Sequence, residues 1–184
     1  MRSILHESLN KRESPSFKTV TIDTQTIRRH AIRGLIYDEK VARVLLIQMV
    51  VQDTGKLIWL APGGGMETDE SVEDCLFREV EEETGFRPNA CLGPIWHRRH
   101  QFLLNGKQWD QSEEFYLIST QRFEPVSTNN PVEFEARAFR AFKWWTAEEI
   151  AAASDEIFVP LRFAEHFRSL VEDGLPHESI DVGV

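Results

Sequence analysis

The sequence of 184 residues has little cysteine and no long hydrophobic segment. Its two cysteines, Cys75 and Cys91, are too few for a disulfide framework and lack metal-ligand spacing, so we expect a reducing compartment and no zinc site. The longest apolar run, Val44 to Val51, is too short to cross a bilayer. The first 27 residues contain no stretch that resembles a signal peptide. We therefore predict a cytoplasmic protein with no membrane partner.

Proline, glycine and positive charge are also scarce. The chain has only 8 Pro and 10 Gly, and 41% of its residues are hydrophobic, which is typical of a folded domain and not of a disordered or fibrous chain. The 21 Lys and Arg residues face 30 Asp and Glu residues, for a formal net charge of -9. Such a chain repels polyanions, so nucleic acid is not an expected partner, and any phosphate-bearing ligand needs local cations.

Hydrophobic patterning predicts one domain in which helices interrupt a series of strands. We expect strands at 27–37, 41–51, 56–60, 95–104, 107–119 and 138–145, and helices at 72–83, after 146 and at 160–171. Asn105-Gly106 predicts a hairpin. This order favours an α/β or α+β sandwich with a mixed sheet. We place a polar N-terminal extension at 1–26, the domain at 27–174 and a C-terminal tail at 175–184.

The predicted helix at 72–83 carries carboxylates on the face that should be apolar. At about 100° per residue, one stripe contains Cys75, Leu76 and Val80. Glu79 and Glu83 fall inside this stripe, and Glu82 lies at its edge. Arg78 alone cannot neutralise three carboxylates whose desolvation is costly. Clustered oxygen ligands without Cys or suitably spaced His indicate a hard divalent ion, Mg²⁺ or Mn²⁺.

The same region resembles the signature box of the Nudix hydrolases at every fixed position. The matching residues are Gly64, Glu70 and the run Arg78-Glu79-Val80-Glu81-Glu82-Glu83-Thr84-Gly85-Phe86. Phe86 is the one minor difference from the family pattern, because the family more often has an aliphatic residue at this position. The preceding run Trp59 to Gly63 and the later Trp144-Trp145-Thr146 also look like the family.

The resemblance implies a Nudix-type α/β/α sandwich that hydrolyses a nucleoside diphosphate linked to another group, with Mg²⁺ or Mn²⁺ as cofactor. The metal ligands implied by the resemblance are Gly64, Glu79, Glu82 and Glu83. Arg78 with Glu70 would hold the helix and the loop in register. A metal in such a site polarises phosphoryl oxygens and lowers the pKa of bound water, while a carboxylate removes the proton.

The sequence leaves the identity of the general base open. Glu79 is one candidate, and the others are Glu113, Glu114, Glu133 and Glu135. Both parities of the strand around 113 are apolar, so alternation does not decide between its two glutamates. Among the glutamates outside the box, we select Glu113 as the candidate general base. The alternative is that each of these glutamates is an ordinary surface residue.

Candidate substrate contacts come from arginines and tryptophans. We assign Arg33, Arg98 and Arg99 to phosphate binding, because the guanidinium fork matches phosphate geometry, and Trp59 to base stacking. The alternatives are surface ion pairs for the arginines and core packing for the tryptophans, including Trp96 and Trp109. His97 and His100 are three apart in a predicted strand and so do not share a metal.

We therefore expect a metal-dependent pyrophosphohydrolase of small nucleotides. The competing interpretation is a Nudix-fold module that binds nucleotides without hydrolysis, but such a module does not need the intact carboxylate set. A di-metal carboxylate oxidase would need Glu-x-x-His pairs, which are absent. Convergence of Arg28, Arg29, Arg33, Arg98 and Arg99 into a basic groove would instead favour RNA. A homodimer is possible by analogy with the family.

Overall fold

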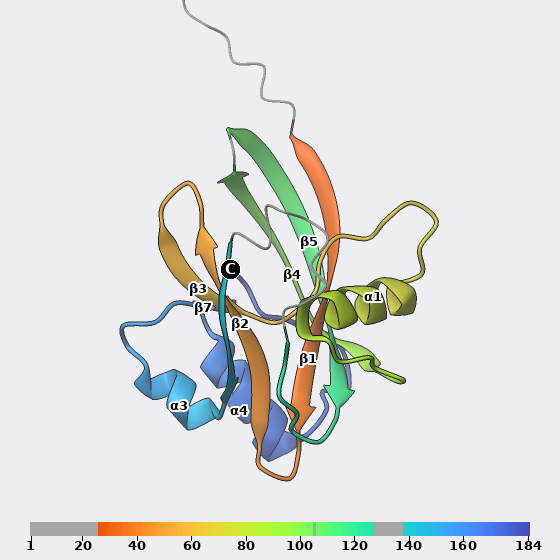
Figure 1. Cartoon of the computed structure of the whole chain (residues 1–184), viewed down its shortest axis with the longest axis vertical. Coiled ribbons are helices and arrows are strands. Elements are labelled where there is room, and N and C mark those ends of the chain that lie inside the picture. The colour runs from red at the N-terminus through yellow and green to blue at the C-terminus, as the bar shows by residue number, and fades with distance from the viewer. Residues whose placement is uncertain (1–25, 105, 127–137) are drawn as a thin grey trace, which may run out of the picture.

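The computed structural model describes residues 26–104, 106–126 and 138–184 of the chain. A curled mixed sheet carries helices on both faces (Figure 1). Its strands are β1 (Ile27–Asp38), β2 (Arg43–Val51), β3 (Lys56–Leu60), β4 (Leu92–Leu104), β5 (Lys107–Ser119), β6 (Phe139–Trp145), β7 (Phe158–Val159) and β8 (Ile180–Asp181). The helices are α1 (Val72–Thr84), α3 (Ala147–Ala152) and α4 (Phe163–Asp173).

The strands are ordered β7-β3-β2-β1-β5-β4-β8, and β6 also pairs with β2. β1 and β5 run parallel from the pair Ile27 and Trp109 to the pair Tyr37 and Ser119. β4 and β5 form an antiparallel hairpin in which Leu104 lies opposite Lys107, which confirms the predicted hairpin. The parallel pair places side chains from two distant segments next to each other near the centre of the sheet.

The sheet divides at β2. Leu45 pairs with both β1 and β6, whereas Ile47 pairs with both β3 and β6. β1 and β3 therefore share one edge of β2 at its opposite ends. Beyond β2, the segment 62–65 takes the neighbouring position along β1, where Pro62 O accepts from Gly34 N at 2.7 Å and Gly64 O accepts from Ile32 N at 2.9 Å.

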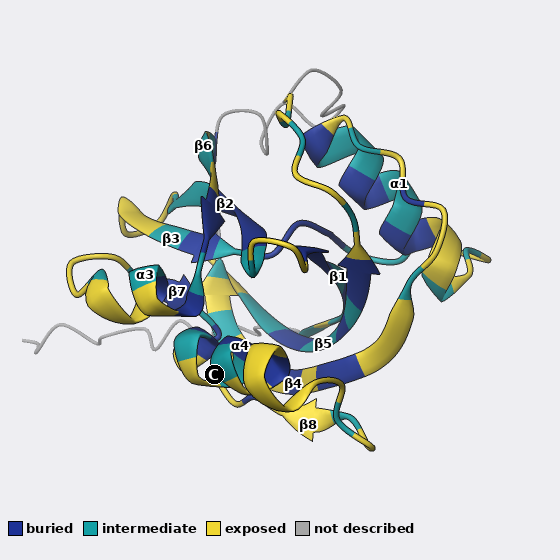
Figure 2. Cartoon of the chain, turned by 90° about the horizontal axis from the view of Figure 1, so that it is seen from below, coloured by how far each residue is buried: buried dark blue, intermediate teal, exposed yellow. Residues whose placement is uncertain are grey.

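Side-chain alternation along β1 directs residues into two cores. Ile32 and Ile36 pack with Val80 of α1 in one core. Leu35 packs with Phe167 of α4 in the other. Figure 2 shows α1 on one side of β1, and α3 and α4 on the other. This layering confirms the predicted α/β/α sandwich.

The C-terminal residues 175–184, which the sequence placed outside the domain, pack onto it. β8 pairs in parallel with β4, Val182 is buried, and its N–H donates to His97 O at 3.0 Å. The boundary drawn at 174 therefore does not separate two structural units. The predicted extension at 1–26 lies outside the described residues except for its last position. Over the described ranges, no helix has the length and apolar character that a membrane span requires.

Candidate active site

The carboxylate-bearing helix α1 is fixed at both ends by its own sequence. Ser71 caps the N-terminus, where its hydroxyl accepts from Asp74 N at 3.1 Å. Gly85 ends the helix with φ of 71°, a left-handed conformation that glycine adopts without strain. The observed helix matches the predicted one to within one residue. The predicted apolar stripe is confirmed, since Cys75, Leu76 and Val80 are completely buried.

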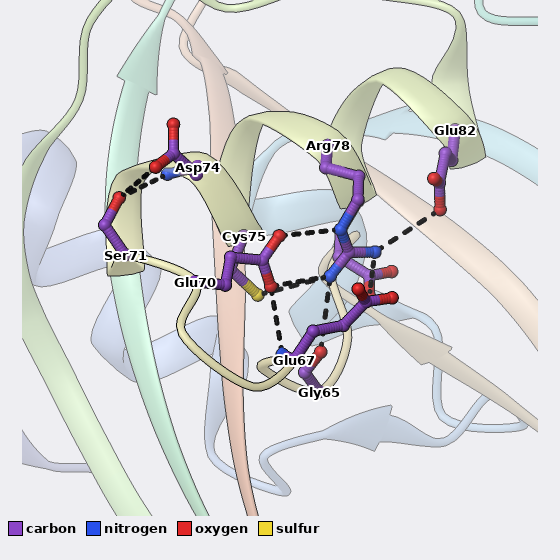
Figure 3. Close-up of polar contacts among 9 residues, drawn as sticks. Gly65, Glu67, Glu70, Ser71, Asp74, Cys75, Arg78 and Glu82 are labelled. Atoms are coloured by element: carbon purple, nitrogen blue, oxygen red, sulfur yellow. Dashed lines mark hydrogen bonds and ion pairs between the residues drawn. The ribbon is translucent and has the colours of Figure 1, made fainter.

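Arg78 gathers the acidic side chains around α1 and the preceding loop (Figure 3). It contacts Glu70 through two hydrogen bonds, from Nε at 2.7 Å and from Nη2 at 2.9 Å. Its Nη1 donates to Glu79 at 2.8 Å and lies 3.5 Å from Glu82. These hydrogen bonds lower the pKa of Glu70 to about 2 and hold it ionised. The guanidinium thus partly neutralises three carboxylates of the box.

The glycine loop, Gly63 to Gly65, contacts two carboxylates of α1 directly. Glu83 Oε2 accepts from Gly63 N at 2.7 Å. Glu79 is buried against Gly64, where an added Cβ would lie 2.5 Å from the Glu79 carboxylate. Loop backbone and helix carboxylates therefore meet without intervening side chains, which is the close approach that glycine permits.

The donor set fits a hard divalent cation in its chemistry. The ligands that the resemblance implies, the side chains of Glu79, Glu82 and Glu83 and the carbonyl of Gly64, would supply only oxygen atoms, which suit Mg²⁺ or Mn²⁺. Within the described ranges, no three acidic, His or Cys side chains already have the spacing of a metal site. The carboxylates contact Arg78 and Gly63 instead. Metal binding therefore requires them to turn from these protein partners.

Glu113 is the centre of a buried ion-pair network, and its geometry contradicts the role of general base. Its side chain is 0% exposed. Arg33 contacts Oε1 at 2.9 Å and 2.8 Å, and Arg98 contacts Oε2. Burial favours the neutral acid, but the two arginines outweigh it and lower the pKa of Glu113 to about 2. A carboxylate so enclosed cannot take a proton from a substrate water.

The same network contradicts the assignment of Arg33 and Arg98 to substrate phosphates. Their side chains are 12% and 5% exposed. Arg33 uses Nε and Nη2 for Glu113 and Nη1 for the carbonyl of Gly63. Burial disfavours its charge, but Glu113 and Glu83 hold the pKa of Arg33 above its ordinary value. Arg33 is therefore a buried cation that links β5 to the glycine loop.

Trp59 is a core residue, so its assignment as a base-stacking platform is wrong. It is 4% exposed and packs edge-to-face on Trp145, with ring centroids 5.1 Å apart. Its indole N–H donates to Glu156 at 2.9 Å. Period-two alternation from β3 directs this ring to the core against α3 and α4, whereas α1 lies on the opposite face.

Arg99 remains accessible, at 67% side-chain exposure, and pairs with Asp110 through two hydrogen bonds of 2.8 Å and 2.6 Å. It lines a cavity of about 270 Å³ together with Arg28, Arg29 and His30. Three of the five arginines considered for a basic groove therefore converge, while the other two are withdrawn to Glu113.

The remaining candidate bases are distributed between β5 and a segment outside the described residues. Glu114 accepts from the Tyr116 hydroxyl at 3.0 Å and lies 3.7 Å from His30. Glu133 and Glu135 lie in 127–137, outside the described residues. Gly63, which connects Arg33 to Glu83, was not among the predicted site residues. Its position in a run of three glycines was the feature of the sequence that could have indicated it. Its φ of 131° explains why glycine is required at this position.

Known proteins resemble this chain in sequence and in fold. The curated RNA pyrophosphohydrolase of Sphingopyxis alaskensis is 26% identical over 163 residues, which cover 83% of this chain and 96% of that protein. Nucleoside triphosphatase NudI of Enterobacter sp. is 32% identical over 92 residues, 50% of this chain and 64% of that protein. The crystal structure of MutT NUDIX hydrolase from Burkholderia pseudomallei superposes with a TM-score of 0.56 at 23% identity, covering 76% of this chain and 97% of that one.

The family model described as NUDIX domain matches residues 27–166, a range that includes β1, the glycine loop and the whole of α1. The chain therefore belongs to the Nudix family of hydrolases, enzymes that cleave phosphoric anhydride bonds.

Proposed function

We propose that this enzyme uses Mg²⁺ or Mn²⁺ to hydrolyse the pyrophosphate bond of small nucleoside diphosphate derivatives. The observation that carries the proposal is the position of three carboxylates beside the glycine loop: Glu79 and Glu82 contact Arg78, and Glu83 accepts from Gly63 N. These three side chains and Gly64 O would hold the metal, which would polarise the phosphoryl oxygens and acidify a bound water. A module that only binds nucleotides does not need this complete set.

Within this proposal the residues of the chain divide the work. Arg78 and Glu70 hold α1 against the loop, and Arg33 holds the Gly63 carbonyl. Since Glu113 is enclosed, we assign proton removal from the attacking water to a carboxylate oxygen of Glu79, which lies against Gly64. The water oxygen then attacks phosphorus in line with the leaving phosphate oxygen.

The net charge of -9 supports a compact substrate over a long polyanion. Each added phosphate of an extended chain needs its own cation, whereas one pyrophosphate can be held by the metal and a few arginines. Both cysteines are free thiols, which suits the reducing cytoplasm that we propose. A homodimer also remains a proposal.

Removal of pyrophosphate from RNA 5′ ends is the second candidate. Two observations favour it: the likeness to the RNA pyrophosphohydrolase of Sphingopyxis alaskensis and the cavity lined by Arg28, Arg29 and Arg99. The cavity has the positive charge that a 5′ polyphosphate requires. However, the Arg99 guanidinium already donates two hydrogen bonds to Asp110, which reduces its capacity to bind an RNA phosphate.

A direct competition assay tests the proposal. The purified enzyme is given nucleoside diphosphate sugars, dinucleoside polyphosphates, nucleoside triphosphates and 5′-triphosphate RNA, with Mg²⁺ and with Mn²⁺, and products are identified by mass spectrometry. We expect metal-dependent cleavage between phosphorus atoms, with the highest kcat/KM for a small nucleotide at physiological salt. A higher kcat/KM for RNA than for every small substrate would select the second candidate. Tight nucleotide binding without any turnover would contradict the proposal and favour a module that binds nucleotides without hydrolysing them.

A further inference from the structure

Three buried polar atoms without hydrogen-bond partners gather on one face of the β4–β5 hairpin. In the part of the chain that the structure describes, five such side-chain atoms occur, and three of them belong to His100, Trp109 and Gln111. His100 lies directly opposite Gln111 in the hairpin register, and Phe102 lies opposite Trp109. Native structures pair the great majority of buried polar atoms, so such a cluster calls for a partner.

The side chains of this cluster are held in fixed orientations. The rings of His100 and Phe102 stack at 5.0 Å with 18° between their planes, and those of Phe102 and Trp109 stack at 6.4 Å with 10°. Gln111 is 3% exposed, and its Nε2 donates to Glu113 at 2.8 Å. That bond sets the amide so that Oε1 is the atom left without a donor.

The hydrogen-bond partners that these atoms lack are ones that a polar aromatic ring can supply. Trp109 Nε1 can only donate, so it needs an acceptor. Gln111 Oε1 can only accept, so it needs a donor, which the N–H group of a ligand can supply. The two residues are two apart on one strand, and their side chains leave the same face about 7 Å apart. A planar heterocycle with an amino group or ring N–H beside a ring nitrogen or carbonyl supplies both partners.

This face is connected to the site already described. Gln111 contacts Glu113, Glu113 contacts Arg33, and Arg33 contacts the carbonyl of Gly63 beside Glu83. His100 Nε2 lies 3.7 Å from Glu113, beyond hydrogen-bond distance. Burial and the charge of Arg98 lower the pKa of His100, so its ring is neutral at neutral pH and suits an uncharged ligand.

We propose that Trp109 and Gln111 recognise the nucleobase of the substrate, with Trp109 Nε1 donating to the base and Gln111 Oε1 accepting from it. Phe102 is the positioning residue that fixes the indole plane. The proposal rests on the proposed function for its substrate class, but it concerns binding and is tested by binding.

The test uses Trp109→Phe, which removes one N–H and keeps an aromatic ring. Isothermal titration calorimetry with Mg²⁺ measures the α,β-methylene analogues of ADP, GDP, CDP and UDP, which resist cleavage. Methylenediphosphonate, which has the two phosphorus groups and no base, is the reference ligand. Trp145→Phe is the matched control, because Trp145 Nε1 is also buried without a partner but lies in the core against Trp59 and Phe158.

We expect the wild type to bind at least one analogue more tightly than methylenediphosphonate. Trp109→Phe should weaken the tightest analogue by about tenfold, the effect of one hydrogen bond, without changing methylenediphosphonate binding or the melting temperature. Gln111→Met should weaken the same analogue and reduce discrimination among the four bases. Trp145→Phe should leave every affinity unchanged.

Three results would overturn the proposal. One is binding that does not depend on the base in the wild type. Another is unchanged analogue affinity in Trp109→Phe, especially with a lower melting temperature, which would indicate a buried structural water at Nε1. The third is an equal loss of methylenediphosphonate affinity. If the enzyme cleaves no nucleoside diphosphate derivative but base-dependent binding is lost in Trp109→Phe, the proposed function fails and this inference stands.

Discussion

Arg33 and Glu83 bind opposite sides of one residue, Gly63. Arg33 Nη1 donates to the Gly63 carbonyl, and Glu83 Oε2 accepts from the Gly63 N–H at 2.7 Å. Since Arg33 is itself held by Glu113, a continuous line of hydrogen bonds runs from the buried centre of the sheet to a carboxylate of α1. The position of that carboxylate therefore depends on a residue in β5.

The first prediction concerns the buried ion pair of Arg33 and Glu113. Arg33→Ala should lower the free energy of unfolding by about 3–5 kcal/mol, because it leaves an enclosed carboxylate with one partner fewer. Arg33→Lys should restore part of the loss. Urea denaturation measures both, with Arg162→Ala, which breaks an exposed pair with Glu165, as the control without measurable effect. Unchanged stability in Arg33→Ala would contradict the network.

The second prediction separates two neighbouring glycines. In Gly63→Ala, φ of 131° and a Cβ placed 2.1 Å from Ile32 O should lower the free energy of unfolding by at least about 2 kcal/mol. In Gly64→Ala the new Cβ meets the flexible end of Glu79 at 2.5 Å, so the side chain can move and stability should change less. Turnover should nevertheless fall in Gly64→Ala. Thermal denaturation and kcat measured on both variants check the contrast, which equal melting temperatures would refute.

The third prediction tests the assignment of the metal ligands. Glu82→Gln and Glu83→Gln should each lower kcat by about 100-fold or more while keeping side-chain volume and the circular dichroism spectrum. Glu81→Gln is the control on the same helix, because Glu81 pairs with Arg87 at the surface. Near wild-type turnover in either of the first two variants with Mg²⁺ would show that the assignment is wrong.

The fourth prediction is that Mg²⁺ stabilises the fold. An ion that binds only the folded state at 100 times its Kd adds about 3 kcal/mol, so the melting temperature should rise across a millimolar titration. Glu79→Gln should reduce this rise. Sodium chloride at matched ionic strength is the control for screening. A flat titration in the wild type would count against the carboxylate site.

The fifth prediction concerns the loss of stability at low pH. The pKa values of Glu70 and Glu113 are lowered from 4.5 to about 2, so their contribution is complete above pH 4.5 and is lost as the pH falls towards 2. In that window the unfolded state binds more protons and stability decreases. Glu70→Gln should flatten the decrease, because glutamine has no carboxyl group to protonate. Urea midpoints at pH 7, 4.5 and 3 measure this, and Glu165→Gln in an exposed pair should change the slope less. An unaltered slope in Glu70→Gln would exclude its ion pair as the cause.

The sequence was sufficient for features with local causes. The bounds of the helix predicted at 72–83 and its apolar stripe depend on residues a few positions apart, and both are observed to within one residue of the prediction. The burial of Glu113 depends on which strands flank β5. Arg33 comes from β1, 80 positions earlier, and Arg98 from β4, so alternation within one strand could not reveal the enclosure.

Trp59 illustrates the same limit for an aromatic residue. It lies just before the glycine loop in the sequence, and an aromatic ring can either stack on a base or pack in the core. The direction of its side chain is set by the pleat of β3, and its partners come from later segments, Trp145 from β6 and Glu156 from the residues after α3. Proximity along the chain therefore did not predict the face on which the ring lies.

The parallel pairing of β1 with β5 has a consequence for the order in which the enzyme matures. During synthesis from the N-terminus, the acidic helix α1 emerges well before β5, and until then Arg33 has no Glu113 and β1 has an unpaired edge. A nascent chain that stops before β5 therefore contains the whole signature box without the support that positions Gly63. We therefore expect catalytic competence only after the second half of the sheet docks, which is a non-local step and hence a slow one.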